Sequence, residues 1–384
     1  MADAMSSLSV AVELARALIR NASVTPDRSG AQGLLADRLA ASGFEVFALP
    51  FGEGEALTPN LFARLGRGAP HLCFAGHTDV VPPGDAAWST GPFDGTVRDG
   101  RVYGRGACDM KGGIAAFVAA AEAYLSRHGT PRGSISLLLT GDEEGPARFG
   151  TVKVLEWMAA HGHIPDFCVV GEPTNPTCMG DMIKVGRRGS INLRIEVEGV
   201  QGHVAYPDRA DNPVHRLLAI LGALTARPLD DGTPWFQPSS LQVTSVDVGN
   251  TATNVIPSCA SAAVNIRFND LHTGASLAGW VETVCRQYAP RARVESRISG
   301  EAFRTEAGAE VGLLADAVER VTGRRPALDT GGGTSDARFV AQYCAVAEFG
   351  LVGASMHKAD EHVAIEDLVA LTAIYDDFLE RLMA

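Results

Sequence analysis

The feature that most constrains the fold is a series of short apolar segments that each run directly into an acidic residue or a histidine. These segments are 71–76, followed by His77 and Asp79; 134–140, followed by Glu143 and Glu144; and 167–170, followed by Glu172. Short apolar runs of this kind are typical of buried strands. In open α/β sheets, ligands bind outside the carboxyl ends of the strands. We therefore expect an α/β fold that gathers these polar side chains at one site.

The residue types at these positions are those that a catalytic metal centre requires. A glycine-rich turn adds Asp109 just ahead of an alanine-rich helical stretch. Zinc takes imidazole and carboxylate ligands, and a shared carboxylate can bridge two ions about 3.5 to 4 Å apart. Asp79 is placed to hold the second ring nitrogen of His77. Because the adjacent Glu143 and Glu144 cannot both bind one ion without strain, one can be a ligand and the other a general base. The pattern predicts a two-metal hydrolase.

Each of these features also has a structural interpretation. A single acid at a strand end is more often a helix cap or a turn residue, and an isolated His-x-Asp is a weak sign of a metal site. Glu143 and Glu144 alone could belong to a solvated loop. His161 and His163 lie at a predicted helix C-terminus, where they favour the helix dipole, and we assign them a structural role. It is the repetition after successive strands that favours the metal site.

The composition is that of a globular enzyme. At 384 residues the chain is too long for one ordinary core, so two domains are expected. The net charge of -12 and the absence of basic runs argue against nucleic acid and anionic membranes as partners. No apolar run reaches the roughly 18 residues that span a bilayer, and the start lacks the basic region of a signal peptide. Seven cysteines without C-x-x-C spacing predict reduced thiols, and we expect a cytoplasmic protein.

The order of predicted elements changes once along the chain. Helices at 8–20, 29–41, 112–127 and 150–161 first alternate with short strands. There follow a strand at 190–198, a helix at 213–226, strands at 241–248 and 259–268, a helix at 274–288 and a strand at 293–299. This βαββαβ order is typical of a ferredoxin-like unit. Helices at 309–322 and 365–382 and a strand at 345–349 then restore the α/β pattern. We expect residues 1–186 and 300–384 to form the metal-binding catalytic domain, and residues 187–299 an inserted domain.

Particular motifs give the chain a resemblance to a known family. The broader motifs are 77–82, 109–113, 143–144 and 172–174, and the more specific ones are 186–190, 200–207, 210–213, 253–257 and 332–339. On these residues, the chain resembles the dinuclear-zinc aminoacylase and carboxypeptidase superfamily over nearly its whole length. Within it, the chain is similar to the desuccinylases of bacterial lysine and diaminopimelate biosynthesis. One departure is Asp360, where family members often carry Asn before the glutamate that corresponds to Glu361.

The resemblance implies a fold and a set of metal ligands. The fold is a zinc-peptidase-like catalytic domain, with a central mixed sheet flanked by helices, and an inserted ferredoxin-like lid domain through which relatives form homodimers. Two divalent ions are implied, zinc in both sites or with cobalt in the second. Asp109 would bridge them, with His77 and Glu172 completing one site and Glu144 and His357 the other.

It also implies the roles of residues outside the ligand set. Glu143 would be the base, assisted by Asp79 beside the histidine ligand. His203 would stabilise the oxyanion in the other subunit's active site. The substrate anchors would be Arg188, Arg267, Asn254, Gly333, Thr334 and Ser335. For each arginine a surface ion pair is the alternative, and the choice between Arg187 and Arg188 stays open.

The implied reaction is hydrolysis of N-succinyl-LL-2,6-diaminopimelate to succinate and LL-2,6-diaminopimelate. An acetylornithine deacetylase, or another acyl-amino-acid hydrolase or carboxypeptidase, would share every metal ligand and differ in its anchors. A catalytically silent binding relative would be expected to have lost Glu143 or a ligand, and neither is missing. Side activity on other N-acyl amino acids is left open.

Overall fold

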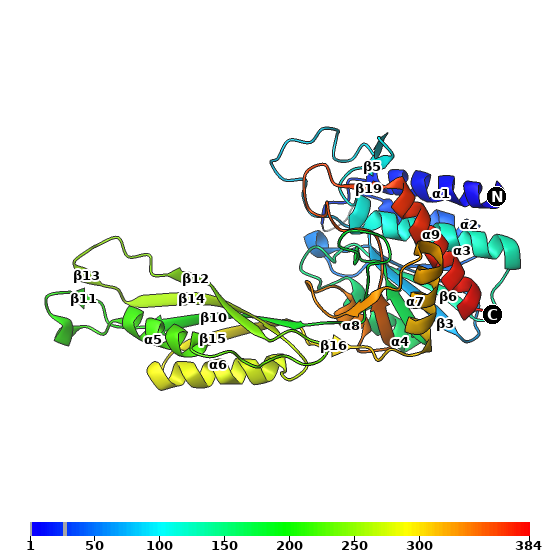
Figure 1. The fold of residues 1–384 in the computed structure, drawn as a ribbon. Helices are drawn as coiled ribbons and strands as arrows, with labels where there is room; N and C mark the ends of the chain where they lie inside the picture. Colours follow the sequence, from blue (N-terminus) through cyan, green and yellow to red (C-terminus); the bar gives the residue numbers. More distant parts are fainter. Residues whose placement is uncertain (1, 26–28) are drawn as a thin grey trace. The chain divides into compact units, whose positions relative to one another are not determined.

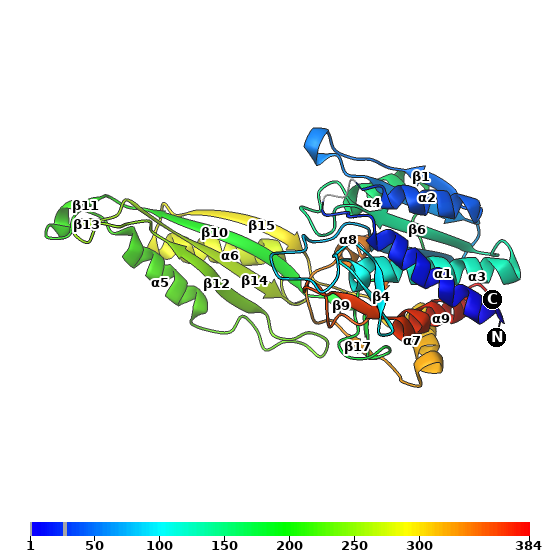
Figure 2. The ribbon, with the colours of Figure 1, turned by 90° about the horizontal axis from the view of Figure 1, so that it is seen from above.

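The computed structural model describes residues 2–25 and 29–384, and it separates into two compact units (Figures 1 and 2). The first unit comprises Met1–Val185, Thr305–Asp329 and Ser335–Ala384, and the second comprises Gly186–Arg304 and Thr330–Thr334. The second unit extends beyond the expected limits of 187 and 299 because β9 (Gly186–Arg187) pairs with β16 (Phe303–Arg304). Thr330 belongs to it as well, since its hydroxyl donates to the carbonyl of Trp235.

A mixed eight-stranded sheet forms the centre of the first unit. Its strands, in spatial order, are β1 (Glu45–Ala48), β2 (Asn60–Leu65), β6 (Ser134–Thr140), β3 (His71–His77), β7 (Phe167–Val170), β18 (Ala345–Glu348), β8 (Met182–Lys184) and β17 (Ala327–Asp329). β3 runs parallel to both β6 and β7, and β7 runs parallel to β18. The carboxyl ends of these four strands therefore lie at the same edge of the sheet. β3, β6 and β7 are buried throughout, as near-continuous apolar runs predict for strands covered on both faces.

Helices cover this sheet. They are α1 (Ala2–Ile19), α2 (Ala31–Ala41), α3 (Gly112–His128), α4 (Thr151–His161), α7 (Ala309–Thr322), α8 (Ala337–Val340) and α9 (Ile365–Leu382). The short helices η1 (Gly54–Ala56) and η2 (Ala107–Lys111) and a small sheet of β4 (Thr96–Arg98), β5 (Arg101–Tyr103) and β19 (His362–Ala364) complete the unit. α4 packs on β2, where Trp157 meets Phe62, while the neighbouring Leu61 faces the other core with α3. Because successive residues of a strand point to opposite faces of the sheet, helices cover both faces of this sheet.

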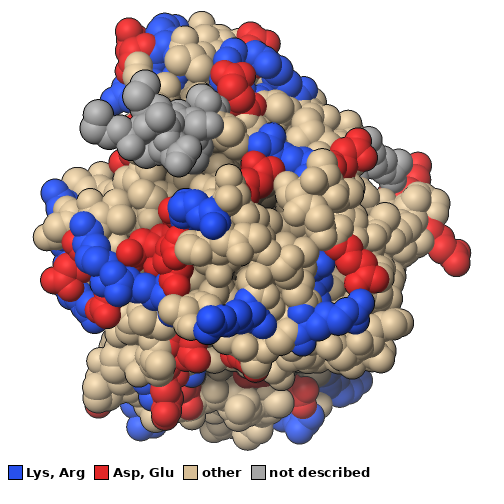
Figure 3. Space-filling model, turned by 90° about the vertical axis from the view of Figure 1, so that its right-hand side faces the viewer, with Lys and Arg blue, Asp and Glu red and all other residues tan. Residues whose placement is uncertain are grey.

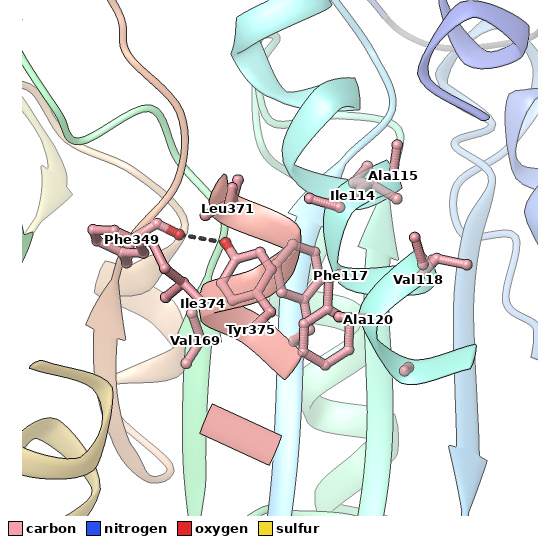
Figure 4. Packing of buried hydrophobic residues seen from close by; sticks show 14 of the residues in the cluster. Ile114, Ala115, Phe117, Val118, Ala120, Val169, Phe349, Leu371, Ile374 and Tyr375 are labelled. Atoms are coloured by element: carbon pink, nitrogen blue, oxygen red, sulfur yellow. Dashed lines mark hydrogen bonds between the residues drawn. The ribbon is translucent and has the colours of Figure 1, made fainter. Parts of the chain in front are cut away.

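The main core lies between the sheet, α3 and α9 (Figure 4). The rings of Phe74 on β3 and Phe117 on α3 stack with centroids 4.4 Å apart, and Tyr375 of α9 meets both rings edge-on. The hydroxyl of Tyr375 donates to the carbonyl oxygen of Phe349 at 2.5 Å, so the one polar atom of this ring is satisfied inside the core. This packing fixes the strand ends that carry the site.

The second unit is a four-stranded antiparallel sheet with two helices. Its elements are β10 (Gly189–Glu198), α5 (Pro213–Thr225), β12 (Ser240–Asp247), β14 (Cys259–Phe268), α6 (Gly274–Tyr288) and β15 (Arg293–Gly300), with β11 (Gly202–His203), η3 (Pro207–Arg209) and β13 (Val255–Ile256) between them. The spatial order is β12-β14-β10-β15, and this confirms the ferredoxin-like unit. Asn212 caps α5 by accepting from the backbone N–H of Val214 at 3.0 Å, and Pro213 takes the first helical position.

Ion pairs join neighbouring helices at the surface of the first unit. Figure 3 shows one face, on which basic and acidic side chains lie interspersed in small groups. Arg127 of α3 contacts Asp376 and Glu380 of α9, and Arg320 of α7 contacts Asp377. None of the helices in the described part of the chain is long and apolar enough to cross a membrane.

Candidate active site and metal centre

The predicted acids and histidines of the first unit meet at the carboxyl edge of the parallel strands. His77 is the last residue of β3 and stands in register with Thr140, the last residue of β6. Glu143 and Glu144 follow β6 within four residues, and Glu172 follows β7 within two. Asp109 lies in η2, immediately before α3, and His357 lies in the loop between β18 and β19. Parallel pairing therefore brings together the residues that end or follow β3, β6 and β7, while Asp109 and His357 come from η2 and from a loop.

Asp109 stands between the two histidines. One carboxylate oxygen, Oδ1, is 3.2 Å from Nε2 of His77, and the other, Oδ2, is 3.2 Å from Nε2 of His357. Each histidine has a second carboxylate beside it: Glu172 Oε1 is 3.8 Å from His77, and Glu144 Oε1 is 2.9 Å from His357. The cluster thus has two similar halves that share Asp109. His357 adopts a left-handed backbone conformation with φ of 61°, which is uncommon outside glycine and is concentrated at functional sites.

The electrostatics of the cluster show an excess of negative charge. Burial raises the pKa of Glu143 well above its ordinary value, and the charges of Glu172 and Asp336 raise it further. Hydrogen bonds to Asp109 and Glu144 raise the pKa of His357 to about 10. Carboxylates that crowd together in this way favour bound cations, because a divalent ion can replace the protons that the ligands otherwise retain.

The side chains of the cluster are of the types that bind metal ions in proteins. Among the described residues, two groups have ligand atoms that all lie within 4.8 Å of one another: His77 with Glu143 and Glu172, and His77 with Asp109 and Glu144. Imidazole and carboxylate together suit zinc and similar divalent ions. Because Glu143 lies near His77 as well as beside Glu144, position alone does not divide the ligand and base roles between the two glutamates.

Asp79 supports the site in a way that the sequence did not predict. The expected contact from its carboxylate to Nδ1 of His77 is 3.7 Å long, whereas the backbone carbonyl oxygen of Asp79 lies 2.8 Å from that nitrogen. Since a carbonyl can only accept, Nδ1 carries the proton and Nε2 is left to face the cluster. The carboxylate instead accepts the backbone N–H groups of Glu143 and Glu144, at 3.2 and 3.0 Å. Burial raises the pKa of Asp79 to about 6.

Two of the predicted residues, His203 and Asn254, are neighbours in the second unit. β11 pairs with β13, which sets His203 opposite Val255, the residue after Asn254. The backbone carbonyl of Asn254 accepts from Val204 at 3.1 Å. His203 is exposed, and its Nδ1 accepts the backbone N–H of Ala205 at 3.0 Å. A neutral imidazole that accepts at Nδ1 carries its proton at Nε2, so His203 presents a donor to solvent.

Arg188 and Arg267 lie close together in the second unit. Arg267 stands in register with Ser190 on the neighbouring strand. Burial lowers the pKa of Arg267, and the charge of Arg188 lowers it further. Arg267 donates from Nε to Asn265 at 3.1 Å, while Nε of Arg188 is buried and unpartnered among the described residues. Within the described chain neither guanidinium forms a salt bridge, so together they make a cationic position suited to an anion.

The remaining predicted anchors differ in how accessible they are. Gly333 is exposed and Thr334 is half-buried, and both belong to the segment of the second unit that the returning chain contributes. Ser335 belongs to the first unit and is buried. Its hydroxyl donates to Oε1 of Glu348 at 2.8 Å. The side chain of Ser335 therefore has a structural partner that its sequence motif did not indicate.

Sequence reasoning missed two buried residues that contact the backbone of the site, Arg105 and Glu361. They form a buried ion pair at 2.6 Å, and Glu361 accepts from the backbone next to Asp109. The available signal was a charged residue between two glycines, Gly104 and Gly106, in a turn otherwise made of small residues. His161 and His163, assigned a structural role, both stack on Trp157 of α4.

Comparisons with known proteins show which family and which relatives the chain is similar to. The model of peptidase family M20/M25/M40 matches residues 73–381. A succinyl-diaminopimelate desuccinylase from Gluconacetobacter diazotrophicus is 70% identical over 373 residues, covering 97% of each chain. Another from Gluconobacter oxydans is 62% identical over 369 residues, covering 96% of each.

Solved structures show the same fold at low sequence identity. Aminopeptidase PepT from Bacillus cereus superposes with a TM-score of 0.80 at 18% identity, covering 98% of this chain and 99% of that one. A dinuclear metal-binding peptidase of the M20 family from Bacillus subtilis superposes with a TM-score of 0.73 at 16% identity, again covering 98% and 99%.

Proposed function

Because this chain belongs to peptidase family M20/M25/M40, we propose that its acid–histidine cluster is the metal centre of a desuccinylase. The reaction is hydrolysis of N-succinyl-LL-2,6-diaminopimelate to succinate and LL-2,6-diaminopimelate, a step of lysine and diaminopimelate biosynthesis. The relatives at 70% and 62% identity, aligned over nearly their whole length, support this activity. The observation that carries the metal centre is the position of Asp109 between His77 and His357.

Five residues hold the two ions in this proposal. Asp109 binds both, since each of its carboxylate oxygens faces a different histidine. His77 and Glu172 complete one site, and Glu144 and His357 complete the other. Zinc is proposed for both sites, with cobalt as an alternative in the second, because imidazole and carboxylate suit either ion. When bound, such ions supply a nucleophilic water at neutral pH and polarise the carbonyl under attack.

Glu143 performs the proton transfers. It takes the proton of the attacking water as the new C–O bond forms at the succinyl amide carbon, and it returns a proton to the departing amine as the C–N bond breaks. Burial raises the pKa of Glu143. A raised pKa suits this role, because the base must hold the proton between the two steps. The carboxylate of Asp79, which accepts from the backbone of Glu143, keeps the base in place.

His203 is proposed to stabilise the oxyanion in the active site of a second subunit. The exposed Nε2–H described above supports this role, because an oxyanion donor must be free to point outward. A homodimer through the inserted unit would supply it. β12 is an edge strand of that unit's sheet, and Val246 on it and Leu218 on α5 are 49% and 57% exposed. Edge strands and exposed apolar side chains are features that dimer interfaces cover.

Arg188 and Arg267 are proposed to bind carboxylates of the substrate, which carries three. Their proximity and the absence of a described acidic partner support this, because an anion bound between two neighbouring cations offsets their mutual repulsion. Asn254, Gly333, Thr334 and the backbone of Ser335 would add neutral donors. The seven free cysteines support the predicted cytoplasmic location, where thiols stay reduced.

The test is steady-state kinetics on N-succinyl-LL-2,6-diaminopimelate and on acetylornithine, with the same metal-loaded preparation. We expect kcat/KM for the succinyl substrate to exceed that for acetylornithine by at least about a hundredfold, because a site built for an additional carboxylate leaves its arginines unpaired with the shorter acyl group. A preference for acetylornithine would assign the chain to the deacetylases instead.

A further inference from the structure

Arg105 and Glu361 form an ion pair that is almost completely shielded from water. The guanidinium Nη1 lies 2.6 Å from Oε2 of Glu361, and the two side chains are 2% and 0% exposed. Removing two charges from water costs several kcal/mol per ion, so a buried pair is a poor source of stability compared with apolar packing. We therefore looked for its role in the backbone groups to which the two side chains also bond.

Glu361 holds the backbone that carries Asp109. Its Oε1 accepts the N–H of Cys108 at 3.1 Å and lies 3.4 Å from the N–H of Asp109. The thiol of Cys108 also donates to this oxygen, at 3.5 Å. In addition, the carbonyl of Glu361 accepts the N–H of Gly104 at 2.8 Å. One side chain thus fixes the residue whose two oxygens face the two histidines.

Arg105 reaches the two loops that follow the histidines. Nη1 donates to the carbonyl of Lys358, the residue after His357, at 3.3 Å. Nη2 donates to the carbonyls of Pro82 and Pro83 at 3.4 Å each, in the loop that follows His77. These two longer contacts are weak singly, but one planar guanidinium makes them together with its bond to the carboxylate. The indole of Trp88 lies over the guanidinium, with Cζ 5.2 Å from the ring centroid.

We propose that Arg105 and Glu361 are positioning residues, which hold Asp109 and the two histidine-bearing loops at the spacing that two metal ions require. This proposal rests on the proposed function, which supplies both the metal ligands and the reaction. Residues that orient metal ligands without touching the ion change metal affinity or activity by about 10- to 100-fold when replaced. The pair would act by that route, since it bonds the backbone of one ligand and the chain beside two others.

The main test is Arg105→Lys. Lysine keeps a positive charge beside Glu361 but cannot span the glutamate and both loops, because its ammonium is a point charge. Zinc affinity would be measured by competition with a chromogenic chelator, and unfolding of the metal-free protein by circular dichroism. We expect zinc to bind about 10- to 100-fold more weakly, with a metal-free melting temperature within a few degrees of wild type. At saturating zinc, kcat should fall while KM changes less than about twofold, because the substrate anchors are untouched.

A matched control exists in the same unit. Arg38 of α2 and Glu122 of α3 form a bidentate ion pair, with nitrogen–oxygen distances of 2.8 and 2.6 Å, between helices that do not carry the ligands. Arg38→Lys should leave zinc affinity, kcat and KM at wild-type values. This pair is partly exposed, with side chains 33% and 24% accessible, so the control tests the loss of an Arg–Glu ion pair away from the ligands.

A second variant covers the case in which Arg105→Lys does not fold. Replacing both Arg105 and Glu361 by Gln removes both charges together and leaves no uncompensated ion in the interior. Weaker zinc binding in the folded double variant would support the proposal. Wild-type zinc affinity and kcat in either folded variant would overturn it, and so would losses matched by Arg38→Lys. If neither variant yields folded protein under conditions where Arg38→Lys folds, the pair is needed for folding and the proposal is also rejected. A wild-type protein that binds zinc but has no desuccinylase activity would instead refute the proposed function.

Discussion

Mixing two inactive variants, His203→Ala and Glu143→Ala, should restore activity if each active site is shared between two subunits. Glu143 lies in the first unit and His203 in the second. Each variant alone should be nearly inactive, since an oxyanion donor contributes about 10²- to 10³-fold in kcat and a general base about 10²- to 10⁴-fold. In a mixed dimer, one site combines both defects and the other draws an intact Glu143 from one chain and an intact His203 from its partner.

The size of the recovery follows from this arrangement. With equal amounts and free exchange, about half of the dimers are mixed, and half of the sites in each mixed dimer are intact, so activity should rise to about a quarter of wild type. Native mass spectrometry would verify exchange, and the assay would follow release of succinate. A matched mixture of Glu143→Ala with Glu143→Gln should stay inactive, because both chains lack the base. If exchange is verified and no activity returns, His203 acts within its own chain or has only a structural role.

Two further predictions concern the site, and a third concerns His71, a buried histidine at the opposite end of β3 from the site. Glu143→Ala should keep near-normal zinc content by atomic absorption and lose about 10²- to 10⁴-fold in kcat, whereas Glu144→Ala should lose zinc; the reverse outcome would exchange their roles. Arg188→Lys or Arg267→Lys should raise KM, because an ammonium cannot form a two-bond fork with a carboxylate, and unchanged kinetics in both would make them surface cations. Burial lowers the pKa of His71 to about 4, so the folded state favours the neutral ring and stability is lost as pH falls from about 6.5 towards 4. Between pH 7 and pH 5 that loss should reach about 2 kcal/mol relative to His71→Gln in urea unfolding, and parallel pH profiles for the two proteins would contradict it.

The sequence predicted those parts of the structure in which local pattern and packing agree. β6, β7 and β14 and the helices α6, α7 and α9 have the bounds that their apolar periodicity indicates. The inserted unit was predictable because its strands alternate buried and exposed residues, as in β10, while its helices carry clear caps. The short strands β8 and β17 were missed, since three residues are too few to establish a period.

The parts of the site that could not be predicted depend on contacts between distant segments. The acids and histidines were predictable, because each follows an apolar run or a glycine-rich turn. That Asp79 accepts the backbone of Glu143 and Glu144 depends on how the loops after β3 and β6 meet. The contact between Arg105 and Glu361 spans 256 positions, and the glycines on either side of Arg105 do not indicate which residue it pairs with. Such contacts follow from the packed fold rather than from local sequence.

The most direct test of the proposed chemistry is titration of metal-depleted protein with zinc, while desuccinylation of N-succinyl-LL-2,6-diaminopimelate is followed in the same samples. We expect negligible turnover without metal and a rise to full kcat as two equivalents bind, with Glu143→Ala binding the same two equivalents and staying inactive. Turnover that persists in the presence of excess chelator, or full activity in Glu143→Ala, would contradict a two-metal hydrolase that uses Glu143 as its base.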